Sequence, residues 1–207
     1  MTKQTLLVTG FEPFGSCAEN PSWLCLNDIP GEMNGVRVEK AMLPVAWGKA
    51  ERELNALIDR FRPAAVLSFG MAGGRASLSI ERVAVNLREA ALPDNGGVKK
   101  DGEPVIATGP NAYFTNLPYR EMKAALLEAD LPAAYSLSAG AYLCNSVMYT
   151  ALHRAASDMP EMLAGFVHVP YMSGQSETEF TMSLAQLRRA ACVCCCTVCS
   201  HIAAKRE

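Results

Sequence analysis

Cys144 is the residue of this sequence best placed to act as a nucleophile. It lies in SLSAGAYLCNSVMYTALHRAA, where a predicted strand ends near Gly140 and a predicted helix begins at about Cys144 or Asn145. Unpaired backbone N–H groups and the helix dipole at a helix start favour a thiolate over a thiol. The same N–H groups suit a developing oxyanion. The competing interpretation is a small buried apolar residue, since free cysteine is often buried.

A thiol nucleophile normally needs a base nearby, and His168 is the best candidate among three histidines. It interrupts the run GFVHVPY at the C-terminal end of a predicted buried strand, the edge of an α/β sheet where sites form. His153, followed by Arg154 within a predicted helix, is expected on a solvated face, and His201 lies near the chain end. A hydrogen-bonded core histidine would produce the same pattern, so both interpretations stay open at this point.

Glu81 is the carboxylate best suited to hold an imidazole in one tautomer and to stabilise its charge. It lies in LSIERVAVNL, an otherwise apolar strand-like segment, where a charge is costly unless it is paired. An ion pair with Arg82, or an exposed edge position, would explain the same residue without any catalysis.

The other cysteines fit a catalytic role less well. Cys25 is expected to pack in the core from a short helix, and Cys17 lies in a polar loop. Helical spacing of i, i+3, i+4 and i+7 places four C-terminal thiols on one face, namely Cys192, Cys195, Cys196 and Cys199. We favour packing over a metal site there, because the spacing is not two separated CxxC pairs. All eight cysteines are expected to be reduced thiols.

Apolar runs bounded by Gly and Pro alternate with segments of helical period. The strand-like runs span residues 5–11, 36–43, 64–70, 78–87, 134–139 and 165–170. The helical segments span roughly residues 21–29, 47–60, 119–129, 145–157 and 177–204. This alternation predicts a three-layer α/β/α sandwich with a largely parallel (mixed) central sheet. Residues 88–117 interrupt this alternation of strand-like and helical segments, and a loop of that length is usually functional or mobile.

Composition and charge narrow the class of protein. With 207 residues, 50% of them apolar and 19% charged, we expect a single catalytic domain over residues 1–207. A net charge of −2 without a basic run argues against a nucleic-acid partner. The first apolar run is too short for a signal peptide, and no stretch is expected to cross a membrane. These features predict a soluble, cytoplasmic protein.

Six segments, in order from residue 5 to about residue 175, resemble those of the pyroglutamyl peptidases, also called pyrrolidone carboxyl peptidases. They are LLVTGFEPFG with NPSW, LPVAWGKA, GMAGGRASLSIERVAVN, LPDN, AGAYLCN and GFVHVPY. A single match could be chance, but six in order form a strong signal. The resemblance covers roughly four-fifths of the chain.

The resemblance implies a reaction and a site. The family removes an N-terminal pyroglutamyl residue from peptides without a metal or organic cofactor. On this resemblance Cys144 attacks the pyroglutamyl carbonyl, His168 carries the thiol proton to the leaving amine, and Glu81 orients His168. The lactam is expected in an apolar pocket, whose candidate residues are Phe11, Phe14, Asn20, Met71, Leu92, Tyr142 and Leu143. The resemblance also implies a homo-oligomer, a dimer or a tetramer.

Two positions depart from the family pattern. Met71 stands where many members carry Gln, and a thioether is a weak acceptor and no donor. Ala91 stands where Arg is common, which removes a positive charge. A related amidase or peptidase with altered N-terminal specificity, or an inactive binding relative, therefore stays open. A nucleotide site at GMAGGR is poorly supported, because the G-x-G-x-x-G spacing is missing.

Overall fold

The computed structural model describes residues 3–15 and 17–205. The strands of its main sheet are β1 (Thr5–Phe11), β2 (Glu32–Met33), β3 (Val36–Leu43), β4 (Ala65–Met71), β5 (Leu78–Glu81), β8 (Ala133–Ser136) and β9 (Leu163–Val169). Their order in space is β2-β3-β1-β4-β9-β5-β8. The four strands from β3 to β9 run parallel, whereas β2, β5 and β8 run in the opposite direction.

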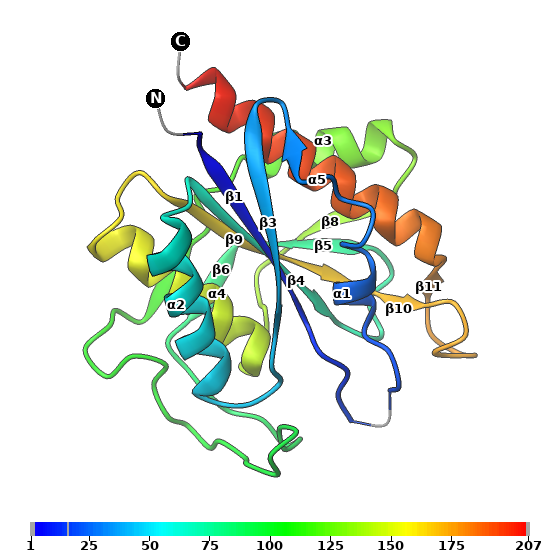
Figure 1. Cartoon of the computed structure of the whole chain (residues 1–207). Coiled ribbons are helices and arrows are strands. Elements are labelled where there is room, and N and C mark those ends of the chain that lie inside the picture. The colour runs from blue at the N-terminus through cyan, green and yellow to red at the C-terminus, as the bar shows by residue number, and fades with distance from the viewer. Residues whose placement is uncertain (1–2, 16, 206–207) are drawn as a thin grey trace.

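Helices cover both faces of this sheet (Figure 1). They are α1 (Pro21–Leu24), α2 (Lys49–Phe61), α3 (Tyr119–Glu128), α4 (Leu143–Ser157) and α5 (Leu184–Ala204). The helices α1, α3 and α5 share one hydrophobic core with one sheet face, and α2 and α4 share a second core with the other. The predicted three-layer α/β/α sandwich with a mixed, largely parallel sheet is confirmed.

The interior strands carry the sequence pattern of a sheet covered on both sides. All seven residues of β1 are buried, as are six of seven in β4 and all seven in β9. Strands buried on both faces read as continuous apolar runs. The strand β3 next to the edge alternates instead, with Val36 and Val38 buried and Arg37 exposed. Because β1, β4 and β9 run parallel, their carboxyl ends lie at the same edge of the sheet.

The last helix begins later than residue 177, where the sequence pattern places it. Ser183 forms a capping box with Gln186, so α5 starts at Leu184. The residues before it form a small two-stranded sheet of β10 (Tyr171–Met172) and β11 (Thr181–Met182). The expected start is wrong because the cap, rather than hydrophobic periodicity, sets the boundary.

The first helix is shorter than the predicted span of residues 21–29, because α1 ends at Leu24. Lys40 explains the early end. Its ammonium group donates to the backbone oxygens of Leu26, Asn27 and Ile29 at 3.2, 3.2 and 2.9 Å. These carbonyl oxygens accept hydrogen bonds from the lysine instead of from the backbone N–H groups of a continuing helix.

The predicted strand over residues 78–87 divides into two elements. β5 stays in the main sheet, whereas β6 (Val83–Val85) pairs with β7 (Ala112–Phe114) in a separate hairpin-like sheet. The break falls at Arg82, whose N–H donates to Ser136 O while its carbonyl accepts from Thr115 N. The long segment at residues 88–117 is thus not entirely loop, since it contributes β7.

By length and composition alone, α5 could cross a membrane, since an 18-residue window reaches a mean hydropathy of 1.3. The helix includes the polar residues Gln186, Arg188 and Arg189, and the expectation that no stretch crosses a membrane stays a prediction. In the fold 44% of that window is buried, and residues such as Leu187, Ala190 and Val198 pack in the core. The apolar composition of α5 is therefore accounted for by packing on the sheet.

Candidate active site

Glu81 and His168 form a buried pair across two antiparallel strands. In β5 and β9, Ser79 is opposite His168 and Glu81 is opposite Phe166, so all four side chains share one sheet face. The Nδ1 atom of His168 lies 2.7 Å from Oε1 of Glu81, and both residues are buried. An ionised carboxylate only accepts, so Nδ1 carries the proton and Nε2 is left as an acceptor. Arg82, the alternative partner considered for Glu81, instead stacks 3.7 Å over the ring of Tyr119.

The thiol of Cys144 lies on the same sheet face, beside His168. Gly70 in β4 is in parallel register with His168 in β9, and neighbouring strands lie about 4.8 Å apart. A Cβ atom on Gly70 would stand only 2.7 Å from Cys144 Sγ and 2.6 Å from the ring of Phe166. The glycine thus makes room for the sulfur at the strand position that is in register with the histidine. The structure brings together the three residues predicted from the sequence as catalytic.

Cys144 is the second residue of α4, close to its expected position at a helix start. The first backbone bond to reach back across this turn runs from Ser146 N to Tyr142 O, at 3.2 Å. The N–H groups of residues 143–145 precede the helical ladder and can donate to an oxyanion. Asn145 fixes this turn, because its amide accepts from Val85 N and donates to the carbonyls of Val85 and Leu87 at 2.8–3.0 Å.

Burial governs the protonation of Cys144 and His168. Burial, reinforced by the negative charge of Glu81, raises the pKa of the Cys144 thiol to about 12. Burial also lowers the pKa of His168, against the opposing effect of its bond to Glu81. The free site therefore holds a thiol and a neutral imidazole. This differs from the expected helix-start thiolate, because loss of solvation outweighs the helix dipole.

A small pocket of about 40 Å³ opens beside the sulfur of Cys144. Its lining residues are Phe11, Phe14, Asn20, Val45, Met71, Tyr142, Leu143 and Cys144. Six of the seven residues expected around the substrate from the sequence line it. Leu92, the seventh, is 67% exposed and lies outside the lining, as does the exposed Ala91. Val45 was missed, because nothing local in its segment marks it as part of a site.

Asn20 brings limited hydrogen-bonding capacity to this pocket. Its Oδ1 accepts from the backbone N–H and the hydroxyl of Ser22, at 3.0 and 2.8 Å, and caps α1. Its Nδ2 donates to the carbonyl of Glu12 at 2.9 Å. One N–H of the amide is left for a ligand, so the side chain is a prepositioned single donor.

The LPDN segment lies behind the pocket lining and is bonded to it through Tyr142. The Tyr142 hydroxyl donates to Pro93 O at 2.9 Å, and Asp94 Oδ2 accepts from Trp47 N at 2.8 Å. Asn95 donates to Glu12 Oε1 and to Pro13 O, both at 2.9 Å. These bonds attach the segment to the ends of β1 and β3, and hold the pocket wall in place.

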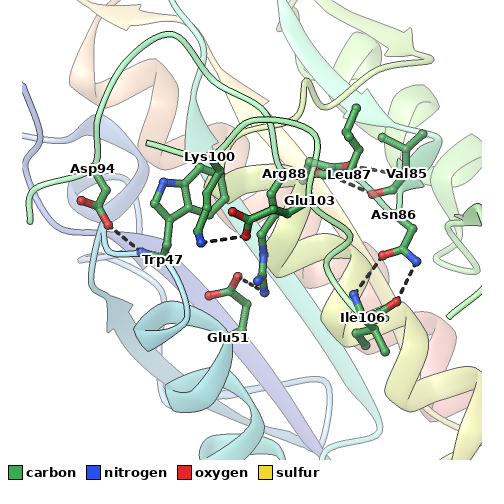
Figure 2. A network of polar contacts seen from close by, with 11 residues as sticks. Trp47, Glu51, Val85, Asn86, Leu87, Arg88, Asp94, Lys100, Glu103 and Ile106 are labelled. Atoms are coloured by element: carbon green, nitrogen blue, oxygen red, sulfur yellow. Dashed lines mark hydrogen bonds and ion pairs between the residues drawn. The ribbon is translucent and has the colours of Figure 1, made fainter. Parts of the chain in front are cut away.

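The rest of the long segment is attached to the protein by a polar network (Figure 2). Arg88 forms an ion pair with Glu51 of α2 at 2.8 Å, and Lys100 contacts Glu103 at 2.7 Å. Asn86 accepts from Ile106 N and donates to Ile106 O, at 2.9 and 2.8 Å. A loop that the sequence leaves undefined is therefore tied to the scaffold at several points.

Arg75 is a site residue that sequence reasoning missed. Its guanidinium contacts Oε1 of Glu81 at 2.9 Å, the same oxygen that accepts from His168. Its position within GMAGGRASLSIER, six residues before a buried carboxylate, is the only local signal. The contact depends on how the turn after β4 folds back, which the sequence pattern does not specify.

The remaining histidines and cysteines lie elsewhere. His153 Nδ1 pairs with the Tyr113 hydroxyl at 2.9 Å on the outer side of α4. Cys25 is buried, and its predicted packing role is confirmed. On α5, Cys194, Cys195 and Cys199 are fully buried while Cys192 and Cys196 are partly exposed. Within residues 3–15 and 17–205, no group of three His, Cys, Asp or Glu side chains is gathered as a metal site.

Comparison with known proteins gives one consistent result. The family model described as pyroglutamyl peptidase matches residues 4–205. The pyrrolidone-carboxylate peptidases of Yersinia pestis (strain Pestoides F) and Yersinia pseudotuberculosis (serotype I, strain IP32953) are 47% identical over 174 residues. In each case the match covers 83% of this chain and 80% of the relative.

Solved structures agree. A mutant pyrrolidone carboxyl peptidase from the hyperthermophile Pyrococcus furiosus superposes with a TM-score of 0.91 at 36% identity, over 96% of this chain and 100% of that one. Pyroglutamyl peptidase I from Bacillus amyloliquefaciens gives 0.92 at 32% identity, over 97% of each chain. The family expected from the ordered sequence segments is thereby confirmed: the chain belongs to the pyroglutamyl peptidase family.

Proposed function

We propose that this protein is a cysteine peptidase that removes an N-terminal pyroglutamyl residue from peptides through an acyl-enzyme on Cys144. The observation that carries the proposal is the arrangement on one sheet face. The His168–Glu81 bond of 2.7 Å stands beside a thiol that is seated over Gly70, in register with the histidine. Family membership supplies the reaction class.

The first half of the reaction forms a thioester. His168 Nε2 takes the thiol proton as the sulfur of Cys144 attacks the pyroglutamyl carbonyl carbon, so that a C–S bond forms. The resulting oxyanion accepts from the N–H groups at the start of α4. His168 then gives its proton to the departing nitrogen and the C–N bond breaks. Because the pKa of Cys144 is raised to about 12, the proton must move during the attack, with His168 as general base.

The second half restores the enzyme. His168 takes a proton from water, the hydroxide oxygen attacks the thioester carbon, and the C–S bond breaks to release pyroglutamic acid. The sulfur regains the proton held by His168. In both halves Glu81 keeps Nδ1 protonated and stabilises the imidazolium that forms.

The pocket favours a substrate whose N-terminus carries no charge. Its lining side chains include none that is ionised at neutral pH. An ordinary N-terminal ammonium would lose its hydration there without a counter-charge, which is costly. A lactam is neutral, its ring suits an aromatic wall, and the free N–H of Asn20 can donate to its carbonyl.

A panel of reporter amides tests the proposal. Pyroglutamyl amide should be hydrolysed, and prolyl amide, which has a similar ring with a charged nitrogen, should be hydrolysed at least about 100-fold more slowly, as expected for an uncompensated buried charge. Prior alkylation of Cys144 should remove both activities. Hydrolysis that survives Cys144→Ala would overturn the assigned nucleophile.

A second candidate is a related amidase or peptidase with altered N-terminal preference. Met71 favours it, because the thioether lines the pocket but offers no donor for a lactam. Comparable cleavage of N-acetylprolyl and pyroglutamyl amides would support this candidate. Cleavage of neither would favour an inactive binding relative.

The cellular setting follows the same proposal. We infer a cytoplasmic homo-oligomer, a dimer or tetramer, that acts on pyroglutamyl peptides and binds neither nucleic acid nor a membrane. The net charge of −2 argues against a nucleic-acid partner, the packing of α5 on the sheet argues against a membrane, and the oligomer rests on the family resemblance. Light scattering on the purified chain and cell fractionation test it.

A further inference from the structure

Arg75 is carried on a tight turn between β4 and β5, and the turn is held in place. Gly73 packs against the ring of Tyr171 so closely that a Cβ atom would overlap it. Gly74 has φ +79°, a left-handed conformation that favours glycine. The arginine that follows this turn reaches Glu81 with its guanidinium.

The guanidinium of Arg75 makes two contacts that converge on the candidate site. Nη1 lies 2.9 Å from Glu81 Oε1, and Nη2 donates to Ser138 O at 2.9 Å. Glu81 is completely buried, whereas 28% of the Arg75 side chain is exposed. Ser138 belongs to the turn that leads from β8 into α4 and therefore to Cys144.

We propose that Arg75 is a positioning residue for the reaction, which keeps Oε1 of Glu81 directed at His168 while anchoring the turn before Cys144. The proposal rests on the proposed function of the three residues. It adds a fourth side chain, in contact with Glu81 rather than with substrate.

Electrostatics give the first reason. Glu81 has no solvent exposure, and a buried carboxylate is costly unless a charged partner compensates it. Arginine supplies that compensation permanently, because it does not deprotonate in proteins. The charge of Arg75 also lowers the pKa of Cys144 and of His168, in opposition to Glu81.

Geometry gives the second reason. The turn over residues 136–140 is braced by Ser136 Oγ, which donates to Ser138 O at 3.1 Å, and by Gly140 N, which donates to Ser138 Oγ at 3.2 Å. Arg75 is the only charged side chain that joins this turn to Glu81 among the hydrogen bonds of residues 3–15 and 17–205. The charged and titratable groups around Glu81 are Arg75 on its turn, His168 on β9 and Cys144 on α4, with Glu179 approaching Gly74 from the other side.

A double-mutant cycle tests the inference. Arg75→Met should lower kcat/KM for a pyroglutamyl amide roughly 10- to 100-fold, as for contacting charged groups that are coupled. In a Glu81→Gln background, which has no carboxylate to hold, the same substitution should cost less than about threefold. An equal loss in both backgrounds would overturn the proposal, since a purely structural role does not depend on the charge of Glu81.

The pH profile of kcat/KM provides a second readout. The charge of Arg75 lowers the pKa of His168, so the pKa of His168 rises without Arg75 and the low-pH limb should move to higher pH. Arg75→Lys keeps the charge and should leave that limb close to its wild-type position. A limb unmoved in Arg75→Met, or displaced equally in both variants, would contradict the inference.

Two controls separate the possible failures. Arg88→Met removes another mostly buried ion pair, with Glu51, in which Glu81 takes no part, and should leave the pH profile unchanged. Cys144→Ala reports on the proposed function itself, which fails if this variant stays active. If Cys144→Ala is inactive but Arg75→Met costs the same activity in both backgrounds of the cycle, only the role of Arg75 is refuted. If Arg75→Met does not fold, Arg75→Gln, which keeps an N–H donor but no charge, takes its place in the cycle.

Discussion

Cys144 and Cys195 are both thiols on helices that pack against the central sheet, one on each face. Burial raises the pKa of Cys144 to about 12 and that of Cys195 well above its ordinary value. The two differ in what surrounds them. Cys144 stands at a helix start beside His168, whereas Cys195 lies in mid-helix among apolar side chains and other thiols.

The comparison shows that the neighbours of a thiol, rather than its own pKa in the resting protein, decide whether it can react. A raised pKa costs reactivity at both positions. Only at Cys144 can a base take the proton, a row of N–H groups meet an oxyanion, and a pocket admit a substrate. The α5 thiols are numerous, but the buried ones, Cys194, Cys195 and Cys199, serve as small apolar residues of the core.

The sharpest way to break this comparison is to delete each thiol. Cys144→Ala should lower kcat for a pyroglutamyl amide by about 10⁴-fold or more, because Cys144 is the thiol that lines the pocket. Cys195→Ala should leave kcat within about twofold. Steady-state kinetics on both variants checks the contrast, and a similar loss in the two would refute it.

The space that Gly70 leaves for the sulfur of Cys144 offers the next test. Gly70→Ala would place a Cβ atom 2.7 Å from Cys144 Sγ, so the thiol or the ring of Phe166 must shift. A displacement of the order of 1 Å is expected to lower kcat roughly 100-fold. Gly31→Ala is the matched control, since nothing lies within 4 Å of the added atom. An active Gly70→Ala with normal kinetics would show that the position of Sγ is not critical.

A more polar pocket wall should change the kinetics less than the two substitutions above. Met71→Gln adds a donor and an acceptor to an almost entirely apolar wall, and a hydrogen bond to the lactam should lower KM about 2- to 10-fold. Met42→Gln, at a residue that is 43% exposed, should leave KM unchanged. An unchanged or higher KM in Met71→Gln would argue that the lactam does not contact this residue.

The α5 thiols should affect stability alone. Cys195→Ser buries a hydroxyl at a fully buried position, which should cost about 1–3 kcal/mol in the free energy of unfolding. Cys192→Ser, at a partly exposed position, should cost less than about 0.5 kcal/mol. Denaturant unfolding measures both, with kcat expected to stay at its wild-type value. A lower kcat in folded Cys195→Ser would mean that α5 communicates with the site.

Much of the scaffold could be predicted because its signals are local. β1 and β3 are continuous or alternating apolar runs, and their predicted bounds are confirmed. Glu81 and His168 stood out because a charged or polar side chain within an apolar strand demands a partner. The start of α5 and the end of α1 were missed, since a cap at Ser183 and a distant lysine, Lys40, set them.

The rest of the site depends on contacts between distant segments. Arg75 reaches Glu81 only because a glycine turn folds back, and Val45 meets the pocket only because β3 ends beside β1. Asn145 holds Val85 at the end of β6 through two hydrogen bonds and Leu87 beyond it through a third, and no spacing in the sequence predicts them. Local sequence patterns identify residues that need a partner, but they do not identify which residue that partner is.

The central claim is that Cys144 carries the acyl group, and trapping that group tests it most directly. The protein is mixed with an activated pyroglutamyl ester, for which deacylation is expected to limit turnover, quenched in acid within the first turnover and digested for mass spectrometry. The account predicts one pyroglutamyl group on the peptide that contains Cys144, and none on the peptides that contain the α5 cysteines. A pyroglutamyl group on any other side chain, with Cys144 unmodified while turnover proceeds, would contradict it.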